Sequence, residues 1–199
     1  RRQNGYEMGA HGYNHQSLAG AGEVPEDLGY NPWASEEDMA ASLTELRDEA
    51  EWSYYGDKTG FAIWDGIENR EDAASNLMTV ARRYTSENPA LTSLVGDLEY
   101  AVNYSQNCWD GDADQAEANQ LMGQAAQALY EELKNTQLSE TDQKYPDQLI
   151  AQMESEQDKI NRSNYNEDAR EFNARLEKFP VNLLRGVAGI EPLTTFDYE

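Results

Sequence analysis

Five stretches of the chain repeat apolar residues at alternating intervals of three and four positions, as one face of an α-helix does. They cover residues 35–55, 61–86, 89–108, 114–138 and 146–178. The third is the most regular, and its stripe consists of Leu91, Leu94, Val95, Leu98, Ala101 and Val102. Segments that contain glycine, aspartate or proline separate the stretches, so each stretch is expected to form a helix of its own.

No segment shows the two-residue alternation of a half-buried β-strand. We therefore expect an all-α fold, an up-down antiparallel bundle of four to five helices. Burying one Leu, Ile, Met or Phe side chain contributes about 1.5 to 3 kcal/mol, so the apolar stripes suffice to stabilise such a bundle without a cofactor.

The first 34 residues differ from the rest of the chain. They are rich in glycine, contain Pro25 and Pro32, and show no sustained hydrophobic period. Two parts are therefore predicted, an irregular N-terminal arm over residues 1–34 and a helical bundle domain over residues 35–199.

The composition is that of a folded but very acidic protein. Charged residues make up 27% of the chain and hydrophobic residues 39%, which is too apolar for a disordered acidic polymer. The formal net charge of -23 repels phosphate backbones and anionic lipid surfaces. We expect no nucleic-acid partner and no direct binding to a membrane surface.

One group of aspartates suggests a cation site. Asp110, Asp112 and Asp114 alternate as at the start of a calcium-binding loop. The rest of that loop is missing, because Gln115 stands where its glycine belongs and Leu121 where its bidentate glutamate belongs. The alternative is a polar connection between two helices, whose last aspartate caps the next helix. Calcium is the only cofactor that this pattern suggests.

The sequence contains no other complete pattern for metal binding or catalysis. His11 and His15 are spaced i, i+4, but the glycines around them oppose a helix and no further ligand lies at metal-site spacing. The chain has no G-x-S-x-G, H-E-x-x-H or Walker A motif. Cys108 is the only cysteine, and both histidines are far from it in the sequence. We predict no catalytic residues and no enzymatic activity.

The C-terminal half carries a recognisable pattern. In order along the chain it contains Tyr145-Pro146, Tyr165-Asn166, Phe172-Asn173, Leu176, Phe179-Pro180, Asn182-Leu183-Leu184, Gly186, Gly189-Ile190 and Phe196. This pattern resembles the closing signature of the LemA family, in which a long helix with two aromatic-Asn pairs ends at Phe-Pro. A short apolar tail with glycines and a final aromatic residue follow. The resemblance covers about residues 61 to 199.

The signature also has a physical interpretation. Tyr165, Phe172 and Phe179 recur every seven residues, so their rings are predicted to stack along one seam of the bundle. Asn166 and Asn173 share this period one position later, and can bond to neighbouring helices or to loop backbone.

The resemblance implies a bacterial-type helical bundle exposed outside the cytoplasm, at the cell surface or in the periplasm. An N-terminal hydrophobic segment would anchor it or be processed. The chain contains no run of about 18 apolar residues, so such a segment would lie upstream. The family has no established enzymatic activity. The arm at residues 1–34 and the break at residues 56–60 depart from its pattern.

The leading hypothesis is a non-catalytic scaffold or envelope component that acts through a protein partner or through self-association. One alternative is a calcium- or cation-binding module that uses the three aspartates. Another is a subunit of an extracellular assembly, in which the aromatic arm docks onto a neighbouring copy.

Overall fold

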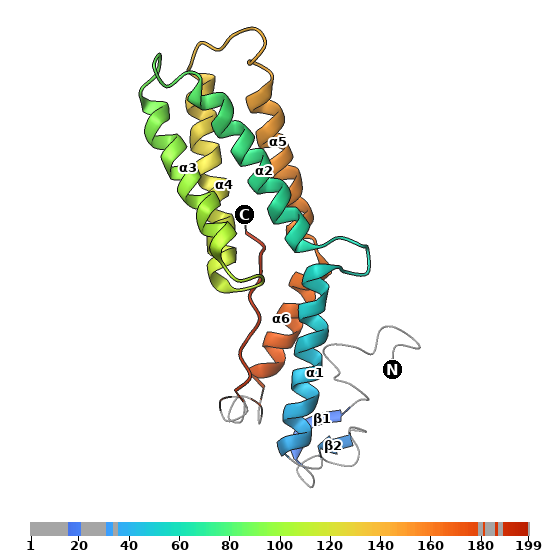
Figure 1. The fold of residues 1–199 in the computed structure, drawn as a ribbon. Coiled ribbons are helices and arrows are strands. Elements are labelled where there is room, and N and C mark those ends of the chain that lie inside the picture. Colours follow the sequence, from blue (N-terminus) through green and yellow to red (C-terminus); the bar gives the residue numbers. More distant parts are fainter. Residues whose placement is uncertain are drawn as a thin grey trace. The chain divides into compact units, whose positions relative to one another are not determined.

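The computed structural model describes residues 16–20, 31–33, 36–178, 181, 186 and 189–198. Within these residues the chain forms six helices and one pair of short strands (Figure 1). The helices are α1 (Glu36–Tyr55), α2 (Ile63–Arg82), α3 (Ala90–Asn107), α4 (Ala113–Lys134), α5 (Tyr145–Asn161) and α6 (Asn164–Leu176). The strands are β1 (Gln16–Gly20) and β2 (Asn31–Trp33). The expectation of a helical fold is confirmed.

The described residues fall into two compact units. The first unit contains β1, β2, α1 and α6, together with the described residues that follow α6 as far as Thr195. The second unit contains residues 59–163, with α2 to α5, and the segment that begins at Phe196.

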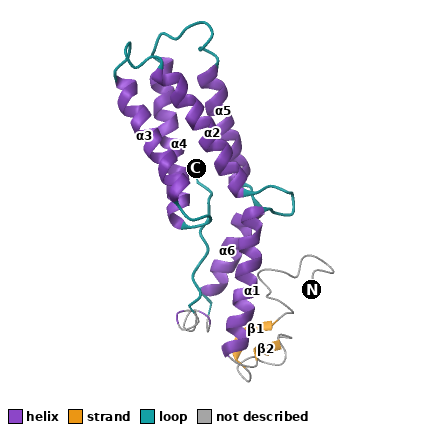
Figure 2. Ribbon diagram, viewed as in Figure 1, coloured by secondary structure: helices purple, strands orange, loops and turns teal. Residues whose placement is uncertain are grey.

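The second unit is built around one apolar core. Helices α2, α3, α4 and α5 lie side by side, with the most extensive contacts between α2 and α5 and between α3 and α4 (Figure 2). Fully buried core residues from the first three of these helices are Leu77, Leu91, Leu98, Met122, Leu129 and Leu133. They occupy the predicted apolar stripes, and α5 adds Met153. The hydrophobic spacing therefore identified the faces that form this core.

The first unit has a smaller core between α1 and α6. Leu43 and Leu176 are completely buried there. The ring of Tyr54 meets the ring of Tyr165 edge-on, with the ring centres 5.7 Å apart. Such edge-to-face contacts between aromatic rings are favourable beyond the area they bury.

The prediction of four to five helices was wrong, because the predicted helix over residues 146–178 is two helices. Helix α5 ends at Asn161 and α6 begins at Asn164. The apolar stripe signals this break, since the step from Ile160 to Tyr165 is five positions instead of three or four. The residues between are polar, and the two helices belong to different units.

Two short strands lie within the predicted irregular arm at residues 1–34. These strands, β1 and β2, pair in parallel. Strands of five and three residues are too short to show a period-two hydrophobic pattern, so the sequence gives no signal for them.

Asp142 links the connection between α4 and α5 to the residues that directly follow α2. Its carboxylate accepts a 2.8 Å hydrogen bond from the Tyr84 hydroxyl and a 2.9 Å charged bond from Arg83. The Tyr84 hydrogen bond, together with Arg83, lowers the pKa of the Asp142 carboxyl group. The connection is thus held by a charged contact as well as by apolar packing.

No helix within the described residues is both long enough and apolar enough to cross a lipid bilayer.

Candidate functional site

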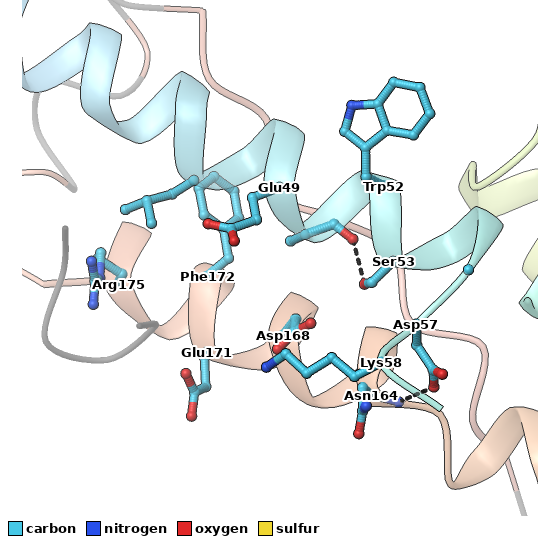
Figure 3. Close-up of a pocket in the computed structure, with 13 residues that line it drawn as sticks. Glu49, Trp52, Ser53, Asp57, Lys58, Asn164, Asp168, Glu171, Phe172 and Arg175 are labelled. Atoms are coloured by element: carbon cyan, nitrogen blue, oxygen red, sulfur yellow. Dashed lines mark hydrogen bonds between the residues drawn. The ribbon is translucent and has the colours of Figure 1, made fainter. Parts of the chain in front are cut away.

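Helices α1 and α6 of the first unit enclose a cavity of about 260 Å³ (Figure 3). One side is formed by the face of α1 that carries Leu46, Glu49, Ala50 and Ser53, spaced as neighbours on one helix face. The facing side of α6 carries Asn164, Asp168, Glu171, Phe172 and Arg175. Trp52 and the residues 56–58 complete the lining. The cavity combines an apolar wall with ionisable groups of both signs.

Arg175 is the unusual group of this cavity. Its side chain is only 4% exposed, yet neither terminal nitrogen of its guanidinium group has a hydrogen-bond partner among the described residues. Burial lowers the pKa of this guanidinium, whereas the charge of Glu171 raises it. Leaving a buried charged donor unpaired is costly, so few such groups persist in folded proteins.

The other end of the cavity holds Asp168. Burial raises the pKa of its carboxyl group, while the nearby charge of Lys58 and a hydrogen bond from Ser53 lower it. In Figure 3 the amine of Lys58 lies beside the Asp168 carboxylate. Asp57 closes this end by accepting a 3.3 Å hydrogen bond from the backbone N–H of Asn164.

Trp52 stands at the edge of the cavity, with 72% of its surface exposed. Its ring points away from the carboxylates of α6 in Figure 3. The apolar wall therefore consists of Leu46, Ala50 and Phe172, of which the last two are buried.

None of the charged residues that line this cavity stands out in the sequence. Glu49 and Arg175 come from helices more than 100 positions apart. One signal is that Arg175 lies three positions after Phe172, on the apolar stripe of its helix, where a cation is unusual. The aromatic member of the wall, Phe172, was found, but as part of the signature.

The signature residues hold the segment that follows α6 in the first unit. Asn173 donates a 2.7 Å hydrogen bond to the backbone carbonyl of Leu193 and accepts a 2.8 Å bond from its N–H. The Tyr165 hydroxyl donates to the carbonyl of Thr194 at 2.8 Å. The prediction that these asparagines bond to loop backbone is confirmed for Asn173. Asn166 is completely buried and also has an interaction partner.

The predicted stacking of aromatic rings along one seam is only partly borne out. Tyr165 and Phe172 are both buried on α6, but Tyr165 packs against Tyr54 of α1. Residues seven positions apart in a helix are about 10 Å apart along its axis, so their rings find partners on the neighbouring helix. Phe179 and Pro180 lie outside the described residues.

The remaining signature residues occupy element ends. Tyr145 is the first residue of α5, and Pro146 occupies its first turn, where its missing N–H costs no helical hydrogen bond. Gly189 has a φ of 66°, a left-handed conformation that side chains rarely adopt, so glycine suits this position.

The comparisons with known proteins agree with this arrangement. The sequence profile described as LemA family matches residues 63–199. The chain belongs to the LemA family. No curated protein and no solved structure matches it. The match begins at the first residue of α2 and ends at the end of the chain, so it includes all of the signature residues of this LemA protein.

In the second unit, Tyr198, two residues after the last residue of the signature, bonds to a buried cation. Arg70 of α2 is 2% exposed and donates to the side-chain oxygens of Asn119 and Gln157 and, at 2.6 Å, to the Tyr198 hydroxyl. No described carboxylate forms an ion pair with it, so its acceptors are neutral, and burial lowers its pKa. The same network continues to the backbone, because Gln157 donates to the carbonyl of Phe196 at 3.1 Å and Asn161 to that of Tyr198 at 3.1 Å.

A groove of about 620 Å³ adjoins this network between α4 and α5. Gly123 lines it, and a Cβ at this position would lie 2.7 Å from the Tyr198 hydroxyl and 2.8 Å from Arg70 Nη2. The missing side chain of Gly123 therefore makes room for the hydrogen bond between Arg70 and Tyr198.

The three aspartates of the candidate calcium site lie around the start of α4. Asp112, and not Asp114 as predicted, is the N-cap, since it accepts a 2.8 Å hydrogen bond from the N–H of Gln115. Nowhere in the described residues do three or more His, Cys, Asp or Glu side chains converge as a metal site requires. His11 and His15 lie outside these residues. The geometry does not favour the calcium hypothesis, which stays a prediction for titration to test.

Gly123→Ala tests the tail network. Alanine normally stabilises a helix interior by up to about 1 kcal/mol relative to glycine. We expect the reverse at position 123, because the new methyl group displaces Arg70 or Tyr198. The matched control is Gly96→Ala in α3, where nothing lies within 4 Å of the added Cβ and a gain in stability is expected. Urea unfolding measures both variants, and equal stabilisation of the two would contradict this account.

Asp168→Asn tests the electrostatics of the cavity. A carboxyl group whose pKa is raised by folding stabilises the folded state at low pH, and this contribution is lost as the pH rises through the folded pKa. Removing the charge should therefore raise the melting temperature near neutral pH, by an amount on the order of a few degrees. The gain should vanish in acid. Glu167→Gln, at an exposed position of the same helix, is the control, and calorimetry from acid to neutral pH is the measurement.

Proposed function

We propose that this LemA protein is a non-catalytic helical bundle that works through protein contacts, as a scaffold or envelope component. The observation that carries the proposal is the exposure of large aromatic side chains. Trp109 is 84% exposed, Trp52 72% and Tyr100 65%. Trp and Tyr are enriched among the residues that dominate binding energy at protein interfaces.

The charge of the protein limits the kinds of partner that it can bind. A net charge of -23 attracts basic and repels strongly acidic surfaces over distances up to about a Debye length. The proposed partner is thus a protein with a basic or neutral contact surface, or a second copy whose contact is made by the uncharged aromatic side chains. Nucleic acid is not proposed.

The non-catalytic part of the proposal is supported by the sequence and by the state of the one thiol. The chain has none of the nucleophile or metal motifs sought above. Burial, with Asp112 and Asp114 nearby, raises the pKa of the Cys108 thiol. Reactive cysteines have lowered pKa values, so the environment of Cys108 opposes nucleophilic catalysis.

We further propose that the helices of the second unit alternate in direction. The connections between them are short, at residues 83–89, 108–112 and 135–144, and short connections join antiparallel neighbours. We also propose that the protein lies outside the cytoplasm, anchored by or processed from an N-terminal hydrophobic segment. The support for this location is family membership and an acidic surface that stays hydrated where salt is high.

Site-specific photo-crosslinking tests the protein contacts. A benzophenone side chain placed at Trp109 or Trp52 should give a crosslinked adduct in intact cells, because both positions are exposed and aromatic. The matched control is the same group at Glu140, an exposed position in a polar connection. An adduct of twice the chain mass indicates self-association, and any other mass a partner. Adducts from neither aromatic position, or equal adducts from the control, would count against the proposal.

Cysteine labelling tests the location. Ser155 is exposed on α5, so a Ser155→Cys substitution in a Cys108→Ser background presents one accessible thiol. A maleimide that cannot cross membranes should label it in intact cells as fully as after lysis. Cys108→Ser alone supplies the background signal. Labelling that requires lysis would place the bundle in the cytoplasm and overturn this part of the proposal.

A further inference from the structure

We propose that the cavity between α1 and α6 binds the C-terminal residue of a partner protein, with the carboxylate on Arg175 and an apolar side chain on Leu46, Ala50 and Phe172. This inference rests on the proposed function and names the chemistry of one contact. Four properties of the cavity support it.

The first property is the unmet hydrogen bonding of Arg175. Within the part of the chain that the structure describes, both terminal nitrogens of its guanidinium lack an acceptor, although the side chain is only 4% exposed and lines the cavity. The two nitrogens form a planar fork that matches the two oxygens of a carboxylate. In Arg70, by contrast, the chain supplies acceptors to both terminal nitrogens. Among the described residues Arg175 has no such acceptor, so its guanidinium group is open to an acceptor on a ligand.

The second property is the balance of charge around the cavity. Its lining contains four carboxylates, Glu49, Asp57, Asp168 and Glu171, and only two cations, Lys58 and Arg175. A phosphate or sulfate with two negative charges would be repelled by the carboxylates. A single carboxylate that approaches Arg175 along the apolar wall gains two charge-assisted hydrogen bonds and meets less repulsion. An otherwise basic or neutral segment also suits the net charge of the protein.

The third property is the position of the apolar residues. Phe172 lies one turn before Arg175 on α6, and Leu46 and Ala50 face it from α1. An apolar side chain next to the carboxylate of the ligand would cover these residues. Burying a Leu-sized side chain is a substantial favourable contribution to binding.

The fourth property is size. Cavities for drug-sized ligands run from about 300 to 1,000 Å³, so about 260 Å³ suits one residue and not a long segment. A terminal residue can enter such a cavity end-on, whereas a residue within a continuous strand needs an open groove on both sides. Capture of a terminal carboxylate is a known mode of peptide recognition.

The test uses fluorescence anisotropy with the complete chain and labelled peptides. The probe is Lys-Ser-Gly-Ser-Leu, with a fluorophore on its N-terminus and a free C-terminal carboxylate. The same peptide as a C-terminal amide removes the charge. A third peptide amide, Lys-Ser-Glu-Leu-Ser, offers a carboxylate on a side chain within the segment. We expect the free acid to bind about ten- to a hundredfold more tightly than either amide, the range that hydrogen bonds to charged groups give.

Variants of the protein locate the contact. Arg175→Met keeps the volume of the side chain and removes its donors, so the preference for the free acid should disappear. Arg170→Met, at an exposed position of the same helix, should keep the preference. Arg175→Lys should retain only part of it, because an ammonium group lacks the planar fork. Circular dichroism verifies that each variant is helical.

Any of these results would overturn the inference: no binding of the free acid by the unaltered protein, equal binding of acid and amide, or unchanged binding by a folded Arg175→Met. If that variant does not fold, the comparison of acid and amide on the unaltered protein decides. Tighter binding of the internal glutamate peptide would assign the site to side-chain carboxylates and also refute the proposal. Failure here with crosslinks still formed from Trp109 would leave the proposed function standing, since Trp109 belongs to the other unit.

Discussion

The last described residues, 190–198, form neither helix nor strand, so their backbone groups depend on side chains for hydrogen bonds. Asn173 bonds to both the N–H and the carbonyl of Leu193, and Tyr165 bonds to the carbonyl of Thr194. In the second unit, Gln157 donates a hydrogen bond to the carbonyl of Phe196, and Asn161 donates one to the carbonyl of Tyr198. The described ends of both units are thus completed by amide and hydroxyl groups, and in the first unit two residues of the LemA signature, Tyr165 and Asn173, supply them.

The two buried arginines show how the same side chain can complete the fold or leave a site open. Arg70 is surrounded by neutral oxygens of Asn119, Gln157 and Tyr198, which satisfy both of its terminal nitrogens without a carboxylate. Arg175 is buried to a similar extent, but no described residue offers an acceptor to its terminal nitrogens. An unpaired buried charge is costly. Acceptors within the chain account for the burial of Arg70, and the proposed ligand accounts for the burial of Arg175.

The helices could be predicted from the sequence because hydrophobic spacing reports directly on buried faces. The core positions Leu98 and Leu129 follow this spacing, and the role of Asn173 followed from its place beside an aromatic residue. The break between α5 and α6 was not predicted, although the five-position step between the apolar residues Ile160 and Tyr165 marks it. The parallel strands were missed because they are too short to carry a period.

The cavity could not be predicted by the same means. Its charged residues come from α1, from the residues after it and from α6, which are distant in the sequence. In a chain with 38 acidic residues, no single carboxylate stands out as a candidate. The aspartates at 110, 112 and 114 did stand out, because they are close in sequence, and the structure uses the second of them to cap α4. Local sequence patterns therefore predicted local structure. The cavity could be recognised only once the folded structure brought its residues together.

The central claim is that side-chain amides fix the backbone of the closing segment. Amide hydrogen exchange of Leu193, followed by NMR, measures this most directly. The account predicts slow exchange in the unaltered protein, fast exchange in Asn173→Ala, and retained protection in Asn173→Asp, which keeps an acceptor for the Leu193 N–H. Exchange of Leu193 at the rate of an unstructured peptide in the unaltered protein would contradict it.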